Sequence, residues 1–310
     1  MTADSTQLGV APLAPHTPSQ GPPPTRADVG RLLLRCPDRL GVVSAVSTFL
    51  TKAGANIESL DQHTTNPDGG TLLQRTIFRK PGLAAAIHDM DQAFADTVAK
   101  DFGIDYRFSE AVKPKRVAIM VSKTDHCLLD LLWRNRRGDL AMSVVMVISN
   151  HPELADQVRP FGVPFIHIPA SRDTRSQAEE RQLDLLRGNV DLVVLARYMQ
   201  IISPEFLRAV GCPMINIHHS FLPAFIGAAP YKRARERGVK LVGATAHYVT
   251  EELDEGPIIE QDVVRVDHTM TPEALAAAGR DVETLVLARA VRWHAEHRVL
   301  LNGHRTVVFR

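Results

Sequence analysis

Residues 31–80 read "RLLLRCPDRLGVVSAVSTFLTKAGANIESLDQHTTNPDGGTLLQRTIFRK" and hold the pattern that decides the fold of the first half of the chain. The apolar run at 31–36 predicts a buried strand, and apolar residues at helical spacing from Val42 to Leu50 predict the following helix. Two more strands, separated by the turn signal "NPDGG", a second helix and a closing strand are then predicted at 56–65, 71–79, 84–100 and 105–111. The order βαββαβ specifies a ferredoxin-like sandwich, in which two helices cover four antiparallel strands.

Strands and helices alternate differently in the second half of the chain. Strands are predicted near 116–122, 143–149, 190–196, 212–218, 241–249 and 257–266. Helical stretches lie between most of them, and a long helix is predicted at about 272–297. This alternation implies an α/β domain of Rossmann-like type, with a mostly parallel sheet covered on both faces. Ligands in such sheets bind beyond the carboxyl ends of the strands.

Composition divides the chain into a tail, two domains and a linker. Residues 1–27 are rich in Pro, Ser, Thr and Gly, which predicts a disordered tail. The first domain is expected over 28–111 and the second over 117–310. The sequence "VKPKR" at 112–116 is typical of a linker.

Charge and cysteine content exclude several classes of protein. The 310 residues carry a formal net charge of +1, which argues against a nucleic-acid-binding protein. No apolar run approaches the ~18 residues that cross a membrane, and the N-terminus lacks the pattern of a signal peptide. Cys36, Cys127 and Cys212 are scattered through apolar stretches, so we expect reduced core residues in a cytoplasmic protein and no zinc site among them.

Residues 214–227, "MINIHHSFLPAFIG", place polar side chains inside an apolar strand. Because side chains alternate along a strand, Asn216 and His218 point to the same side, near its carboxyl end. They either cap the strand end through local backbone or form part of a site. A second strand carries His247 and leads into an acidic loop ending at Asp254, where an Asp before a turn is also ordinary.

An amide, an imidazole and a carboxylate at one sheet edge suit attack on a carbonyl carbon. Asn216 and His218 would stabilise the oxyanion, and Asp254 would orient or deprotonate the nucleophile. A zinc site of His218, His247 and Asp254 is an alternative, although no HExxH-type spacing supports it. A covalent serine is less favoured, because the chain has no GxSxG motif.

Three motifs resemble the folate-dependent formyltransferase superfamily. They are "NIHHSFLPAFIGA" at 216–228, "HYVTEELDEGPII" at 247–259 and "VVLARYMQIISPEFL" at 193–207. The first domain, with "CPDRLGVVSAVSTFL" at 36–50, resembles an ACT domain. An ACT domain in front of a formyltransferase-like domain is the architecture of the formyltetrahydrofolate deformylase family, and the resemblance covers about residues 30–310.

The resemblance implies hydrolysis of 10-formyltetrahydrofolate to formate and tetrahydrofolate, which would balance the one-carbon folate pool and supply formate for purine synthesis. Asn216, His218 and Asp254 would be catalytic, and no metal or cofactor is needed. The implied substrate-binding residues are Leu195, Met199, Gln200, Ile202, Leu207, Met214 and His247.

The resemblance also implies regulation through the first domain. ACT domains bind small amino acids at an interface between copies, here near Asp38, Gly41, Asn56 and Ile57. The chain is therefore expected to form a homo-oligomer through its ACT domains, with no nucleic-acid or membrane partner. The alternative is that this domain only holds the oligomer together.

The choice between water and an amine as acceptor depends on the loop after the first strand of the second domain. Transferases of the superfamily place a Gly-rich phosphate cradle there, whereas this chain has no glycine between Ser122 and Gly138. Water is therefore the expected nucleophile, and a transferase acting on an unidentified amine is the alternative. Either His126 and Cys127 close the space that the amine acceptor occupies in the transferases, or His126 is a surface residue and Cys127 is a core residue.

The family pattern differs at two positions of the loop after 216–228. This chain has Ala229 and Lys232 where related deformylases usually carry a longer polar side chain and often His. The sequence alone does not indicate how Ala229 and Lys232 affect contact with the substrate.

Overall fold

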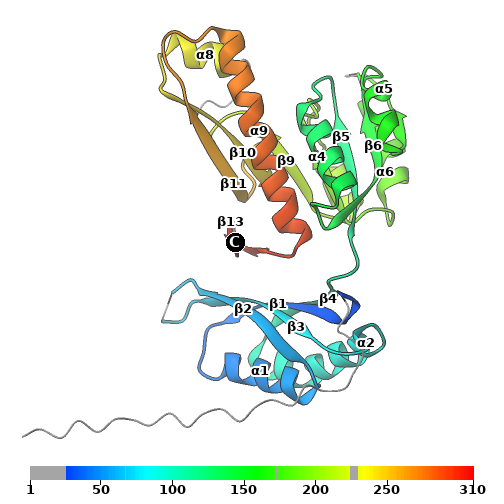
Figure 1. Cartoon of the computed structure of the whole chain (residues 1–310), viewed down its shortest axis with the longest axis vertical. Helices are drawn as coiled ribbons and strands as arrows, with labels where there is room; N and C mark the ends of the chain where they lie inside the picture. The colour runs from blue at the N-terminus through cyan, green and yellow to red at the C-terminus, as the bar shows by residue number, and fades with distance from the viewer. Residues whose placement is uncertain (1–25, 67, 172, 224–229) are drawn as a thin grey trace, which may run out of the picture.

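The computed structural model describes residues 26–66, 68–171, 173–223 and 230–310, and shows two sheets that each carry their own helices (Figure 1). The first sheet has the order β2-β3-β1-β4, and its paired strands are antiparallel. The ferredoxin-like prediction is confirmed. The elements are β1 (Val29–Pro37), α1 (Val42–Lys52), β2 (Asn56–Thr64), β3 (Thr71–Arg79), α2 (Leu83–Phe94), continued by η2 (Ala95–Ala99) and α3 (Lys100–Phe102), and β4 (Asp105–Glu110).

Strand alternation explains how the first sheet receives its two helices. Leu32, Leu34 and Cys36 of β1 point to one side and are buried against α1 and α2. Phe94 packs edge-to-face at this core, with its ring centroid 5.0 Å from that of Phe49.

The second sheet has seven strands in the order β11-β10-β9-β8-β5-β6-β7. Strands β9, β8, β5, β6 and β7 pair in parallel, while β10 and β11 are antiparallel additions at one edge. The elements are β5 (Lys115–Val121), α4 (His126–Arg137), β6 (Met142–Ser149), α5 (Ala155–Val158), η3 (Arg159–Phe161), β7 (Phe165–His167), α6 (Arg175–Leu186), β8 (Leu192–Leu195), α7 (Pro204–Val210), β9 (Met214–His218), α8 (Pro230–Glu236), β10 (Leu241–Tyr248), β11 (Ile258–Arg265) and α9 (Pro272–Ala295).

Helices cover both faces of this sheet, as predicted. Leu128 of α4 and Val286 of α9 belong to the core on one face. Ala178 of α6 and Phe206 of α7 belong to the core on the other face. The central strands are buried on both sides, which accounts for their continuous apolar runs.

The strand order reverses between β5 and β8, and ligand crevices in such sheets lie at this point. Hydrogen bonds tie the two strand ends together. The Ser122 amide donates to the Arg197 carbonyl at 3.3 Å, and the Met199 amide donates to Ser122 Oγ at 2.9 Å. Ser122 Oγ in turn donates to Asn150 at 2.7 Å, so the segment that follows β8 has a fixed position.

The sequence did not predict the C-terminal hairpin of β12 (Val299–Asn302) and β13 (Arg305–Val308). Figure 1 shows β13 and the C-terminus between the two sheets. Leu300 and Phe309 pack on Leu73 of the first sheet. Arg75, also on β3, donates to the carbonyl of His297 at 3.0 Å, so the end of the chain joins the two domains.

The predicted tail and linker meet the structure only in part. Residues 1–25, most of the predicted tail, lie outside the described residues, and Arg26–Asp28 form a 3₁₀ turn before β1. Residues 111–114 connect the sheets, because β5 already begins at Lys115. Ala229 and the side chain of Lys232 also lie outside what the structure describes. No described helix has the length and apolar character needed to span a membrane.

Candidate active site

The pairing of β9 with β10 brings the predicted polar residues together. Asn216 lies directly opposite His247 in this antiparallel ladder, and His218 lies opposite Thr245. Period-2 alternation keeps Asn216 and His218 on one side of β9, facing the same cavity. Residues 249–257 then return across the end of β10 and carry Asp254 to these strands.

The Asp254 carboxylate lies between two histidines. Its Oδ2 is 3.2 Å from His218 Nδ1, and its Oδ1 is 3.7 Å from His247 Nε2. Asp254 has a φ of 60°, the left-handed conformation that Asp adopts more readily than most residues. The strand ends and this turn therefore bring together the amide, the imidazole and the carboxylate that the sequence identified.

These contacts and burial set the charges of the site. Hydrogen bonding from His218 holds the pKa of Asp254 well below its usual range. Asp254 is therefore a carboxylate throughout the neutral range. Burial, followed by the charge of Arg197, lowers the pKa of His219 to about 4, so the ring of His219 is neutral at pH 7.

His247 is buried, with 2% of its surface exposed, and it orients Asn216. Its Nδ1–H donates to the Tyr248 carbonyl at 2.9 Å, which leaves Nε2 as an acceptor in the neutral tautomer. The amide nitrogen of Asn216 donates to this Nε2 at 3.2 Å. Sequence reasoning assigned His247 to substrate binding; His247 lines the same cavity, and its contacts also hold the amide of Asn216 in place.

His218 keeps one ring nitrogen available. Its Nδ1 faces Asp254, while its buried Nε2 has no hydrogen-bond partner among the described residues. A buried polar atom without a partner is costly unless a ligand or water completes it. His218 lines the cavity, and its Nε2 can donate to an oxygen atom bound there when both ring nitrogens carry protons.

The cavity beside these residues measures about 610 Å³, within the range of small-molecule sites. Leu195, Met199, Gln200 and Ile202 line it, as the resemblance implied. Leu207 and Met214 are not among the lining residues. Both pack in the core behind β8 and β9, and Met214 is 3% exposed, so the expectation that these two residues wall the pocket is corrected.

Other residues that line the cavity were not predicted. They are Val249, Thr250, Glu251, Glu252 and Leu253, together with Arg197 and His219. The acidic stretch "VTEEL" precedes Asp254 in the sequence and offered a signal for residues 249–253. The only sequence signal for Arg197 is its position directly after a buried strand.

The four residues expected to bind an effector do not form one site in a single chain. Asn56 pairs with Arg79, which in turn pairs with Val29 at the start of β1. Asp38 follows the other end of β1, roughly 25 Å away along the strand. Gly41 lies three residues after Asp38 and Ile57 follows Asn56, so the two pairs of residues lie far apart within one chain.

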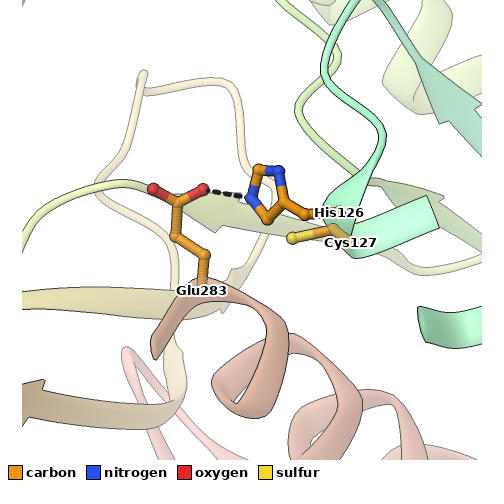
Figure 2. A group of neighbouring side chains, drawn as sticks. All are labelled: His126, Cys127 and Glu283. Carbon is orange, nitrogen blue, oxygen red and sulfur yellow. Dashed lines mark hydrogen bonds and ion pairs between the residues drawn. The ribbon is translucent and has the colours of Figure 1, made fainter. Parts of the chain in front are cut away.

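A second cluster of chemically active side chains lies at the amino end of α4. Figure 2 shows His126 and Glu283 pointing toward each other, with Cys127 beside them. Their donor atoms lie within 4.8 Å of one another, which makes them a possible metal-binding group among the described residues. The guanidinium of Arg197 lies 3.5 Å from Glu283 and already supplies positive charge there. This group is not the His218, His247 and Asp254 set considered from the sequence.

Comparison with known proteins agrees with this architecture. Residues 30–87 match the ACT domain family, and residues 115–291 match the formyl transferase family. A formyltetrahydrofolate deformylase from Mycobacterium bovis is 73% identical over 283 residues, which cover 91% of each chain. The chain belongs to the formyltetrahydrofolate deformylase family.

Solved structures place this deformylase beside both hydrolases and transferases. A formyltetrahydrofolate deformylase from Pseudomonas syringae superposes with a TM-score of 0.87 at 44% identity, over 91% of this chain and 94% of that one. A glycinamide ribonucleotide transformylase from Symbiobacterium toebii superposes with a TM-score of 0.61 at 33% identity, over 66% of this chain and 97% of that one. The deformylase therefore shares the fold of its second domain with a transformylase.

Proposed function

We propose that Asn216, His218 and Asp254 carry out the reaction of the deformylase family in this chain. The enzyme hydrolyses 10-formyltetrahydrofolate to formate and tetrahydrofolate. One observation carries the assignment of residues. Asp254 bonds to Nδ1 of His218, and the opposite ring nitrogen is left buried, without a described partner, beside the Asn216 amide.

The proposed mechanism uses two donors and one carboxylate. Asn216 and His218 Nε2 donate to the formyl oxygen and stabilise the oxyanion, each by on the order of 3 kcal/mol. Asp254 accepts the proton of the attacking water as the new C–O bond forms. Because its pKa is lowered, Asp254 does not keep this proton. The proton passes to N10 as the C–N bond breaks, which releases formate and tetrahydrofolate.

The folate ring is proposed to lie against Leu195, Met199, Gln200 and Ile202 in the cavity of about 610 Å³. The reaction would return tetrahydrofolate to the one-carbon pool and supply formate for purine synthesis. The free cysteines suit a reducing, cytoplasmic compartment.

The ACT domain is proposed to bind a small amino acid between two copies of the chain. Two observations support an arrangement with two chains. Asp38 and Asn56 lie at opposite ends of the first sheet, and Leu40, in the β1–α1 turn, is fully exposed. A homo-oligomer that joins the β1–α1 turn of one chain to the start of β2 in its partner would complete the site.

The first experiment mixes the purified protein with 10-formyltetrahydrofolate without any amine and follows both products. Equal release of formate and tetrahydrofolate is expected. Asp254→Asn should lower kcat/KM at least 100-fold, because the reaction then lacks its proton acceptor and the partner of His218. Glu255→Gln is the matched control, because Glu255 is exposed, next in sequence and not among the residues that line the cavity. Product formation only after an amine is added would instead identify a transferase.

A further inference from the structure

The second domain shares its fold with a transformylase whose named substrate, glycinamide ribonucleotide, carries an amine. An amine is normally a better nucleophile than water toward a formyl carbon. Some feature of this cavity must therefore keep amines away from the formyl group. Arg197, Glu283 and His126 provide such a feature.

Glu283 is a carboxylate held between two basic side chains. It lies on α9 with 1% of its side chain exposed. Its Oε2 is 2.8 Å from His126 Nε2 and 3.5 Å from Arg197 Nε (Figure 2 shows the first contact). His126, Arg197 and Glu283 come from distant parts of the sequence. A buried carboxylate such as that of Glu283 is tolerated only when it is paired.

The cluster borders the formyl site. His126 begins α4 after β5, and Arg197 follows β8, so both lie where the strand order reverses. Arg197 lines the same cavity as Asn216 and His218. His219, next to His218, also lines this cavity, so the two groups of residues meet at one cavity.

The backbone of Arg197 is strained. Its φ of 63° lies in the left-handed region, where a residue other than Gly costs roughly 1–2 kcal/mol. Gly would relieve this strain but would remove a long side chain from the cavity wall. That side chain is 15% exposed, and its Nε forms an ion pair with Glu283. A strained backbone kept at a cavity wall points to a function for the side chain.

We propose that Arg197, held by Glu283 and His126, fills the space beside the formyl group that an amine would need and so makes water the nucleophile. This inference rests on the proposed function of the neighbouring catalytic residues. Removing the side chain should admit a small amine. The C–N bond to N10 then breaks, a C–N bond to the amine forms, and the proton lost by the amine ends on N10.

The test supplies hydroxylamine together with 10-formyltetrahydrofolate and measures formohydroxamate and formate. The wild-type enzyme should give formate almost alone, whereas Arg197→Gly should raise the ratio of formohydroxamate to formate at least tenfold. His297→Gly is the matched control, because His297 has a similar φ of 56° but does not line the cavity. Its product ratio should equal that of the wild-type enzyme.

Two further variants test the role of Arg197 if Arg197→Gly does not fold, and test whether the new activity uses the same site. Glu283→Gln keeps the volume and removes the charge that holds Arg197, so its ratio should rise at least threefold even if Arg197→Gly does not fold. Arg197→Gly combined with Asp254→Asn should form neither product, which ties the new activity to the same site. Wild-type ratios in both single variants would overturn the inference. Failure of the wild-type enzyme to release formate would instead overturn the proposed function.

Discussion

At the scale of the single residue, the proposed mechanism gives Asp254 two roles that act in opposite directions. A proton acceptor works best with a pKa near the working pH, yet hydrogen bonding from His218 lowers the pKa of Asp254. The hydrogen bond that weakens Asp254 as a base fixes the position of His218 and its donor nitrogen. In the proposed mechanism, the position of His218 and the stabilisation of the oxyanion therefore matter more than the basicity of Asp254.

The lowered pKa of Asp254 predicts a pH-dependent contribution to stability. A carboxyl whose folded pKa lies below its unfolded value stabilises the fold above pH ~4, and this contribution is lost as pH falls toward the folded pKa. Asp254→Asn should therefore lower the free energy of unfolding at pH 7 by roughly 1–2 kcal/mol. Urea titrations between pH 7 and pH 3 should show the difference from wild type shrinking with acid.

The surface variant Asp262→Asn is the control for this prediction. Asp262 pairs with Arg289 at 2.8 Å, but both side chains are more than one-third exposed. A loss below about 1 kcal/mol is expected there. A difference for Asp254→Asn that stays constant between pH 7 and pH 3 would contradict the assigned ionisation.

The sequence could predict one half of the site better than the other, and the reason is local. Asn216 and His218 share a strand, and period-2 alternation alone puts them on one side. The role of Glu283 depends on how α9 packs beside α4, a contact that no spacing within the sequence encodes. The orienting role of His247 likewise depends on the ladder register that sets it opposite Asn216.

At the scale of elements, the end of β10 is fixed by a close approach of backbone to backbone. The Tyr248 amide donates to the Pro257 carbonyl at 3.0 Å, which folds residues 249–257 back onto the strand. A Cβ at Gly256 would overlap the carbonyl oxygen of Tyr248, the same oxygen that accepts the Nδ1–H of His247. Only glycine fits here.

Gly256→Ala should therefore damage catalysis without changing any catalytic side chain. The added methyl group must push the turn away from β10 and move Asp254 with it, so kcat is expected to fall at least tenfold. Initial rates of formate release measure this loss. Gly138→Ala is the control, since Gly138 has a φ of 77° but open space around its Cβ position. Gly138→Ala should lower the free energy of unfolding by about 1 kcal/mol and leave kcat within twofold of wild type. An equal loss of kcat in both variants would contradict the displacement of the turn.

Element prediction succeeded where the pattern was long and failed where it was short. Strands of eight or nine residues, such as β1 and β6, carry enough apolar residues to be recognised. The three residues of β7 do not, because their place in the sheet comes from pairing with β6. The C-terminal hairpin was missed because its apolar residues pack on the other domain.

At the scale of the whole molecule, that hairpin joins the ACT domain to the formyl transferase domain. Leu300 is 7% exposed and packs with Phe309 on Leu73 of the ACT sheet. Arg75, with 4% of its side chain exposed, donates to the carbonyl of His297, just past the end of α9. The helix that holds Glu283 is thus followed directly by the segment that contacts the ACT sheet.

Leu300→Ala should uncouple the two domains. The truncation leaves a cavity between them and should cost about 2–4 kcal/mol, so calorimetry is expected to resolve separate melting transitions at lower temperature. Leu301→Ala is the matched control, because Leu301 lies next on the same strand but is 46% exposed, and its loss should stay within about 0.5 kcal/mol. Equal losses in the two variants would mean that this contact does not hold the domains together. If the contact does hold them, any response of formate release to an amino acid should weaken in Leu300→Ala and persist in Leu301→Ala.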